Sequence, residues 1–152
     1  MRRFAVLCCC AAAVVGCAKS EPKAPAASPT PPPPPAISLA DLAGKWTVRG
    51  MNEARDTTLV TYELNATADT SGWTIVFANR QTVPVRVAAV AGDSVVIDAG
   101  PYPSVLRRGA QVTTHGVLRL QDGKMVGLTV AHYKTTSPDS VRRIVAEGTR
   151  TP

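Results

Sequence analysis

The two histidines of the chain, His115 and His132, are its side chains best suited to acid–base or metal chemistry, and they flank a predicted turn at Asp122-Gly123. If this turn is a two-residue type I′ hairpin, His115 pairs with Val130, and both imidazoles lie diagonally on one face of the sheet, close enough to share a metal ion. If it is a three-residue bulged turn, the register slips by one residue and the histidines point to opposite faces. The pairing register therefore decides whether these side chains can act together.

The slipped register is the better prediction, because it gathers apolar side chains on one face. These side chains are Val112, Leu118 and Leu120 on one strand and Val126, Leu128 and Val130 on the next. In either register, two histidines with no carboxylate or thiolate nearby make a poor zinc site. We therefore expect surface histidines and no metal.

The acidic residues and short motifs give no sign of catalysis. Glu63, Asp98 and Glu147 fall within predicted strands, and nothing in the sequence brings two of them together for acid–base work. The chain contains no Gly-x-Ser-x-Gly elbow, phosphate-binding loop, dinucleotide fingerprint or His-Glu-x-x-His motif. We predict no catalytic residue, no cofactor and no enzymatic activity.

A long segment without strand character, Ala99 to Ala110, is the best candidate for a binding surface. Tyr102 lies between two prolines that restrict its backbone, and Arg107 and Arg108 follow. A long loop in a compact β domain is more often functional than a two-residue turn. This loop is a candidate rim over a barrel mouth, with Tyr102 as an apolar contact and the two arginines meeting an anionic group. The favoured alternative is that Tyr102 and Leu106 merely cap the core, because aromatic loop residues often pack inward.

The elements that must position these side chains are β-strands. After Gly44, β-branched and aromatic residues recur with a period of two, which is typical of half-buried strands. The alternating residues are Trp46, Val48 and Gly50; Val60, Tyr62 and Leu64; Trp73, Ile75 and Phe77; Val83, Val85 and Val87; and Val95 and Ile97. Two further runs flank Asp122-Gly123, and the last runs from Val141 to Arg150. Eight strands with mostly short links predict an all-β fold, a single antiparallel up-and-down barrel, since closure removes exposed edges.

The first strand begins in a pattern that resembles a known family. Ser38, with Asp41 three residues on, has the spacing of a capping box for a short helical turn. Gly44-Lys45-Trp46 follows, and it resembles the Gly-x-Trp signature of lipocalins and other calycins. The resemblance implies a lipocalin-like barrel in which Trp46 plugs the closed end and an arginine near the end of the chain packs across it. The candidates for that role are Arg150, Arg142 and Arg143.

The predicted domain also departs from typical ligand-binding lipocalins. It is shorter, and it has no disulfide and no clear C-terminal helix. It is more similar to the compact lipocalin-like domains of bacterial envelope proteins. A barrel this small can be filled by its own side chains, so the sequence leaves open both a ligand cavity and a solid interior.

The beginning of the chain resembles a bacterial lipoprotein precursor. A positive start, MRR, precedes an apolar run from Phe4 to Gly16, which is too short to cross a bilayer and fits a signal peptide. The run ends in Val14-Val15-Gly16-Cys17, which resembles the lipobox cleaved by lipoprotein signal peptidase. The resemblance implies cleavage after residue 16, acyl chains on Cys17 and, with Ala18 rather than Asp next, sorting to the outer membrane. Two or three acyl chains suffice for stable anchoring.

The composition separates three segments: a signal peptide at 1–16, a lipidated Cys17 with a Pro-rich tether through 36, and a folded domain at 37–152. The tether lacks side chains large enough to form a core, so we expect it to be disordered. The domain contains no cysteine, which excludes a disulfide framework. It carries thirteen Lys or Arg against ten Asp or Glu, scattered along the sequence. A nucleic-acid partner is not expected, because such a domain should show a basic stripe.

These patterns together predict a lipid-anchored, non-enzymatic protein of the cell envelope, on the periplasmic or outer face of the outer membrane. Its barrel is expected to bind a small apolar or amphipathic molecule or another envelope component. The alternative is a structural or assembly module with a solid barrel, and a calycin-type enzyme is the least favoured class. The expected partner is the membrane, through Cys17, and the sequence leaves the oligomeric state open.

Overall fold

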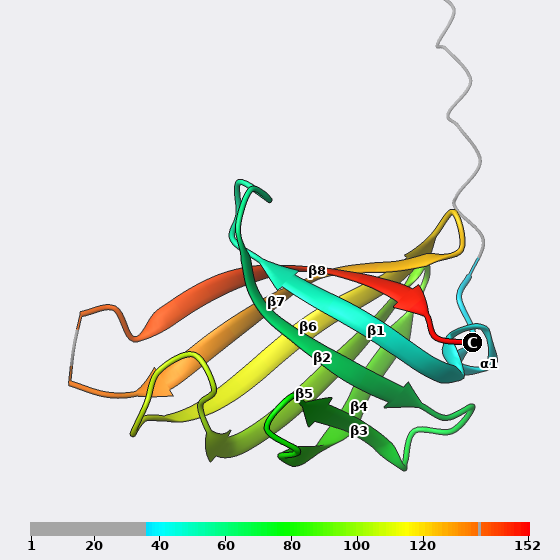
Figure 1. The fold of residues 1–152 in the computed structure, drawn as a ribbon. Helices are drawn as coiled ribbons and strands as arrows, with labels where there is room; N and C mark the ends of the chain where they lie inside the picture. Colours follow the sequence, from blue (N-terminus) through cyan, green and yellow to red (C-terminus); the bar gives the residue numbers. More distant parts are fainter. Residues whose placement is uncertain (1–35, 137) are drawn as a thin grey trace, which may run out of the picture. The chain divides into compact units, whose positions relative to one another are not determined.

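The structure, a computed structural model, describes residues 36–136 and 138–152. The predicted signal peptide, Cys17 and nearly all of the Pro-rich tether lie outside the described residues. The described chain folds into one antiparallel sheet of eight strands that closes on itself, because β8 returns to pair with β1 (Figure 1). This confirms the predicted all-β, up-and-down barrel. Within the described part of the chain, no helix has the length and apolar character needed to cross a membrane.

The strands follow the chain in spatial order, and each connection joins neighbours. One short helix precedes them: α1 (Leu39–Leu42). The strands are β1 (Gly44–Met51), β2 (Thr58–Ala66), β3 (Trp73–Phe77), β4 (Thr82–Ala91), β5 (Ser94–Pro103), β6 (Gln111–Gln121), β7 (Lys124–Lys134) and β8 (Val141–Arg150).

The helix α1 forms where the capping box was expected. The Ser38 hydroxyl accepts a hydrogen bond from the Asp41 backbone N–H at 3.3 Å, and the Asp41 carboxylate accepts one from the Ser38 N–H at 2.8 Å. Leu42, at the end of α1, is fully buried in the core. The backbone N–H of Ile37 also donates to the carbonyl of Gly92 in the β4–β5 turn. The start of the described chain is therefore held at the end of the barrel that α1 covers, which we call the closed end.

The alternation of buried and exposed residues along the strands separates an apolar interior from a polar outer face. The main core cluster fills the closed end, and its largest fully buried side chains are Trp46, Trp73, Leu42, Leu64, Leu118 and Met125. A second, smaller cluster lies toward the other end and includes Val112, Ala131, Tyr133 and Ile144. We call that other end, where the β1–β2, β3–β4, β5–β6 and β7–β8 connections lie, the open end.

The favoured register of the β6–β7 hairpin was wrong. Gln121 pairs with Lys124 across a two-residue turn, so His115 pairs with Val130 and His132 with Thr113. The reason is the turn itself: Asp122 and Gly123 both adopt positive φ, 51° and 74°, as a type I′ turn requires.

The consequence of this register is that the expected apolar face is divided between the two sides of the sheet. Val112 and Leu118 are buried, whereas Leu128 is 40% exposed on the outer face. Leu120, near the β6–β7 turn, is 38% exposed. Small and polar inward residues on β7, including Gly127 and Thr129, occupy the positions that the prediction gave to larger aliphatic side chains.

The segment Ala99 to Ala110 is also more regular than expected. Strand β5 continues to Pro103, with an irregularity in its pairing to β6 between Ala99 and Tyr102. Only residues 104–110 form the connection. Tyr102 is therefore part of the barrel wall rather than a loop residue.

Candidate functional site at the open end of the barrel

The closed end is sealed around Trp46, whose side chain is completely buried. Its indole Nε1–H donates to the Leu42 carbonyl at 2.7 Å, which joins α1 to β1. Arg150 is the direct cross-strand partner of Trp46, and its guanidinium lies over the indole at 4.4 Å from the ring centroid. The same guanidinium donates to the carbonyls of Ala43 and Asp41. The structure thus brings Gly44, which begins β1, together with Trp46 and Arg150, and it leaves Arg142 and Arg143 exposed near the start of β8.

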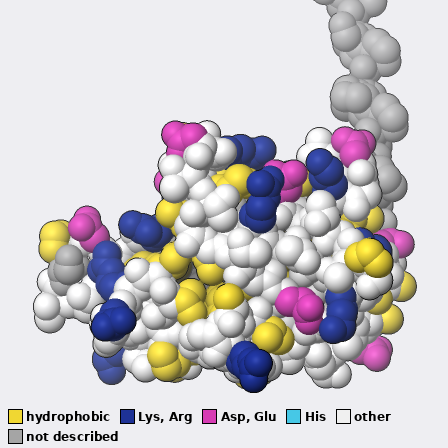
Figure 2. All heavy atoms as spheres, viewed as in Figure 1, with side chains coloured by type: hydrophobic (Ala, Val, Ile, Leu, Met, Phe, Trp, Pro, Cys, Tyr) yellow, Lys and Arg dark blue, Asp and Glu magenta, His cyan; other side chains and the backbone are white. Residues whose placement is uncertain are grey.

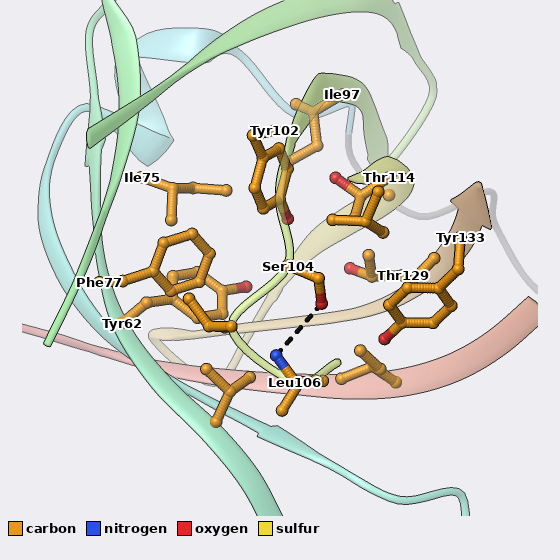
Figure 3. Close-up of a pocket in the computed structure, with 16 residues that line it drawn as sticks. Tyr62, Ile75, Phe77, Ile97, Tyr102, Ser104, Leu106, Thr114, Thr129 and Tyr133 are labelled. Atoms are coloured by element: carbon orange, nitrogen blue, oxygen red, sulfur yellow. Dashed lines mark hydrogen bonds between the residues drawn. The ribbon is translucent and has the colours of Figure 1, made fainter. Parts of the chain in front are cut away.

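The open end contains a cavity of about 60 Å³ (Figure 3). Its lining is mostly apolar and comes from β2, β3, β5, β6, β7, β8 and the β5–β6 connection. The lining residues are Val60, Tyr62, Ile75, Phe77, Ile97, Tyr102, Ser104, Val105, Leu106, Val112, Thr114, Gly116, Thr129, Ala131, Tyr133 and Ile144. None of these described residues is an acid, a histidine or a cysteine.

One wall of the cavity is a row of three aromatic rings. Tyr62 and Phe77 lie 5.9 Å apart between centroids, and Phe77 and Tyr102 lie 5.8 Å apart. Both separations are within the range in which tilted aromatic rings attract one another. Figure 3 shows these rings facing Thr114, Thr129 and Tyr133 across the cavity. An apolar surface therefore faces a surface that carries hydroxyl groups.

Burial favours the neutral form of two phenols of this cavity, those of Tyr62 and Tyr102. Burial raises the pKa of the Tyr62 phenol, and the Tyr102 charge would raise it further. Burial also raises the pKa of the Tyr102 phenol, against a smaller lowering by its hydrogen bond with Thr114. Neutral phenols and threonine hydroxyls can both donate and accept hydrogen bonds. The cavity can therefore satisfy a polar group on a bound molecule without supplying a charge.

The β5–β6 connection is an ordered cover on one side of the cavity. The Ser104 hydroxyl accepts hydrogen bonds from the backbone N–H groups of Leu106 at 3.2 Å (Figure 3) and of Arg107 at 3.0 Å. The Ser104 N–H donates to the Ala110 carbonyl, and the Gln81 side chain donates to the Pro103 carbonyl. This bonding directs Leu106 into the cavity and leaves Val105 37% exposed.

The three residues expected at the rim take different places. Tyr102 lines the cavity. Arg107 lies beside the mouth, with its guanidinium 4.7 Å from the centroid of the Tyr133 ring. Arg108 instead lines an open groove of about 450 Å³ outside the cavity, between the β3–β4 and β5–β6 connections. The two arginines are therefore close to the mouth but do not converge on a single point in it.

The residues that could do acid–base chemistry lie elsewhere, on the outer face of the barrel. The Asp98 carboxylate accepts a hydrogen bond from Arg86 on β4 and contacts His115 Nδ1 on β6 at 2.7 Å. The hydrogen bond from His115, with a smaller contribution from Arg86, lowers the pKa of Asp98. Among the described residues, no group of three or more His, Cys, Asp or Glu side chains is placed to hold a metal ion.

Sequence reasoning missed most of the cavity. Tyr62 and Phe77 were expected only as core residues, and Thr129 and Tyr133 were not singled out. On β7, the inward direction of Thr129 and Tyr133 follows from the two-residue turn at Asp122-Gly123, which sets the β6–β7 register. On β2 and β3, the inward direction of Tyr62 and Phe77 follows from the alternation of side chains along each strand. The two-residue turn was therefore the signal that could have identified the cavity residues of β7. The covering role of Leu106 depends on side-chain hydrogen bonds of Ser104, which no spacing rule predicts.

Comparison with protein-family models, with curated proteins and with solved structures finds no match for this chain. The geometry of the barrel and the sequence patterns that precede it are therefore the basis for assigning a function.

Proposed function

We propose that the protein is a lipid-anchored component of the bacterial cell envelope whose barrel binds a small amphipathic molecule at its open end. The observation that carries the proposal is the contrast between the two ends of the barrel. Trp46, Trp73 and Leu42 fill the closed end, whereas the open end keeps a cavity lined by aromatic rings and hydroxyl groups. A mostly apolar pocket with a few polar groups is the usual form of a small-molecule site.

The size of the cavity limits what it can hold as it stands. A volume of 60 Å³ is far below the roughly 300 Å³ or more that drug-sized ligands occupy. A ligand larger than a short acyl or ring fragment must therefore displace Leu106 and Val105, the two cover residues of the β5–β6 connection. The cavity can grow by this movement without any change in the strands.

The small volume also favours the second candidate function, a structural or assembly module with an essentially solid barrel. In that case the cavity is a packing defect and the envelope partner is another protein. The two candidates differ in one measurable property, namely whether an amphipathic molecule stabilises the barrel through the cavity.

Catalysis is not part of the proposal. The side chains at the cavity offer hydroxyl groups but no acid, base or thiol within the described lining. Asp98 and His115, which do interact, lie on the outer face, and the other side chain bonded to Asp98 is that of Arg86. A binding role needs none of these groups.

The proposed family and location come from two patterns. Gly44, Trp46 and Arg150 lie together in the way that the lipocalin resemblance implies, and the strand count and order are those of such a barrel. The lipobox-like Val14-Val15-Gly16-Cys17 supports removal of residues 1–16, acylation of Cys17 and an outer-membrane location.

Binding is tested by thermal unfolding of the full chain with hexanol, hexanoate or neither. A ligand that binds only the folded state raises the unfolding temperature, and the rise grows with the logarithm of its concentration once that concentration exceeds the Kd. We expect a rise that Ala131→Leu abolishes, because Ala131 lines the cavity and is 1% exposed. Ala88→Leu, on an exposed position of β4, is the matched control and should keep the rise. No stabilisation by either compound would favour the solid-barrel module.

Two further measurements complete this test. Thr129→Val removes a hydroxyl from the cavity at nearly constant volume, so it should weaken the effect of hexanoate without unfolding the protein. Anchoring is tested separately by Cys17→Ser, which should abolish incorporation of labelled palmitate and leave an uncleaved or soluble chain. Palmitate labelling that survives this substitution would refute the assignment of Cys17.

A further inference from the structure

The charged residues, which are scattered along the sequence, are distributed unequally between the two ends of the barrel. Counting each connection with the two residues on either side of it, the open end carries six Lys or Arg against three Asp or Glu. The six cations, which we call the basic rim, are Arg55, Arg80, Arg107, Arg108, Lys134 and Arg142. They come from all four connections of that end. Figure 2 shows several Lys and Arg side chains at this end, at the left of the view, and others over the rest of the visible face.

The closed end, counted in the same way and with the last two residues of β8 included, has three Lys or Arg against four Asp. Its cations are occupied within the protein. Lys45 pairs with Glu63 at 3.3 Å, Lys124 pairs with Glu147 at 3.5 Å, and Arg150 donates to backbone carbonyls and covers Trp46. This end therefore offers an external anion little attraction.

The basic rim differs in that, among the described residues, none of its cations pairs with an acidic side chain. The ion pairs among the described residues join side chains of the barrel wall and the closed end, and none includes a residue of the basic rim. Only Arg107 has a described side-chain contact, with the Tyr133 ring. Unpaired cations held close together repel one another, and an anionic surface placed against them removes that repulsion.

An apolar side chain lies among these cations. Val105 is 37% exposed in the same connection as Arg107 and Arg108, and together with Arg108 it lines the open groove beside the mouth. Apolar side chains flanked by Lys and Arg are the composition that binds the interface of an anionic bilayer, where the apolar group enters the headgroup layer and the cations meet phosphates.

From this arrangement we propose that the basic rim docks the open end of the barrel on an anionic lipid bilayer, with Val105 entering the headgroup layer. A bilayer fits better than a single small anion, because the cations surround the mouth on four connections instead of converging on one point. It fits better than a soluble polyanion, because such a partner would leave Val105 in water. Docking also places the mouth of the cavity against the membrane, so that an amphipathic molecule can pass between the two.

The proposal uses the lipid anchor of the proposed function only to bring the barrel near a membrane. The described chain starts at the closed end, where the Ile37 N–H donates to the Gly92 carbonyl, and the basic rim lies at the opposite end of the barrel. The experiment must therefore measure anchoring and docking separately.

The test uses the purified mature protein in vesicles, with a single added cysteine that carries an environment-sensitive dye. Thr136→Cys places the dye in the β7–β8 connection at the open end, and Thr70→Cys places it in the β2–β3 connection at the closed end; both threonines are exposed. We expect the Thr136→Cys dye to enter an apolar environment in vesicles that contain phosphatidylglycerol but not in phosphatidylcholine alone. The signal should disappear at high salt, because salt screens exposed charges. The Thr70→Cys dye should not respond.

Charge variants identify the surface responsible. Arg80→Gln with Arg108→Gln removes two cations that have no described partner, and it should lower the ratio of docked to undocked protein by roughly ten- to thirtyfold, from about 1 kcal/mol for each cation near an anionic surface. Lys45→Gln with Lys124→Gln removes the same charge from the closed end and should leave the ratio unchanged. Val105→Ser should weaken docking while keeping its dependence on salt.

Several outcomes would overturn the proposal. These are an equal response of both dyes, an unchanged signal in Arg80→Gln with Arg108→Gln, or abolition of the signal by millimolar inorganic phosphate, which would assign the basic rim to small anions. A response to soluble polyphosphate as strong as that to vesicles would assign it to a polyanion. Anchoring is read independently, from flotation with phosphatidylcholine vesicles. If the protein does not float with these vesicles, the lipid anchor at Cys17 is contradicted but the docking is not. The docking can then still be tested by adding the soluble protein to anionic vesicles.

Discussion

Trp46 connects three parts of the closed end. Its indole lies between the helix α1, to which it donates a hydrogen bond through the Leu42 carbonyl, and the guanidinium of Arg150 on the last strand. Because the side chain is completely buried, its removal leaves a cavity that the rigid closed sheet cannot collapse to fill.

Trp46→Ala should therefore lower the free energy of unfolding by about 3 to 5 kcal/mol, the range for large buried aromatic residues. Denaturant unfolding followed by circular dichroism measures the change. Arg150→Met is the companion variant. It keeps the aliphatic cover over the indole but loses the charge and the bonds to two carbonyls, so its loss should be smaller. A loss below about 1 kcal/mol for Trp46→Ala would show that this residue does not support the closed end.

On the outer face, Asp98 contributes to the dependence of the stability of the fold on acid pH. The hydrogen bond from His115, helped by Arg86, lowers the pKa of Asp98 in the folded state below its unfolded value. A group with a lowered folded pKa stabilises the protein above its unfolded pKa, and this stabilisation is lost as the pH falls through the folded pKa. The contribution of Asp98 should thus be present at neutral pH and disappear in strongly acidic solution.

His115→Ala should raise the pKa of Asp98 toward its ordinary value, because it removes the largest cause of the lowering. A pH titration of the Asp98 carboxyl carbon by NMR measures this shift directly. His132→Ala, which removes a histidine from the same outer face, serves as the control and should leave the titration of Asp98 unchanged. An identical titration in the wild-type protein and in His115→Ala would contradict the assignment of the bond.

At the scale of elements, the β6–β7 hairpin shows how a short turn sets which side chains reach the cavity. The two-residue turn at Asp122-Gly123 directs Thr129, Ala131 and Tyr133 inward. A one-residue slip would have replaced them with larger aliphatic side chains on the inner face. The cavity thus depends on the backbone conformation of two residues at the far end of the barrel.

Two glycine substitutions on this hairpin separate backbone strain from crowding. Gly123→Ala should cost about 1 to 2 kcal/mol, since Gly123 has a φ of 74° and a side chain there would meet nothing within 4 Å. Gly127→Ala should cost more, because the added Cβ would lie 2.5 Å from the Val117 carbonyl oxygen. Thermal unfolding of the two variants ranks these effects. A Gly127→Ala protein as stable as the wild type would mean that β6 and β7 are not packed as closely as described.

Elements that are determined by a local sequence pattern could be predicted, and elements on which two patterns conflict could not. The strands with buried β-branched and aromatic residues, such as Trp73–Phe77, were predictable because period-two alternation follows directly from the geometry of a half-buried strand. The capping box of Ser38 and Asp41 was predictable because both partners are local in sequence. The β6–β7 register was not predictable. The grouping of apolar side chains on one face favoured one register, whereas the conformation of the turn favoured the other. Tyr102 was misplaced because two prolines concealed the end of β5.

The cavity and the basic rim were less predictable for a related reason. A cavity is a small difference between the volume enclosed by eight strands and the side chains that fill it, so no single residue indicates it. The basic rim collects cations such as Arg55 and Arg142, which are far apart in the chain and meet only because alternate connections of an up-and-down barrel lie at the same end. The topology was predictable, but its consequence for charge required assigning every connection to an end.

For the whole molecule, these features make the two ends unequal in packing as well as in charge. The larger core cluster fills the closed end and reaches the cavity through Ile75, Phe77 and Ile97, and the smaller one borders the cavity with other side chains of the open end. Closure of the sheet pairs every strand on both sides, so neither end can unfold by peeling off an edge strand. Local opening should instead begin where fewer apolar contacts hold the strands together, which is the open end.

Hydrogen exchange of the backbone amides tests this difference along single strands. Strand β2 runs from the open end to the closed end, so the amide of Val60 should exchange faster than that of Leu64, which is fully buried in the main cluster. On β7, the amide of Tyr133 should likewise exchange faster than that of Met125. A molecule that occupies the cavity should slow exchange at Val60 and Tyr133 more than at Leu64 and Met125, since it adds contacts only at the open end. Uniform protection along both strands, with or without hexanoate, would mean that the barrel unfolds as one unit and that its open end is no weaker than its closed one.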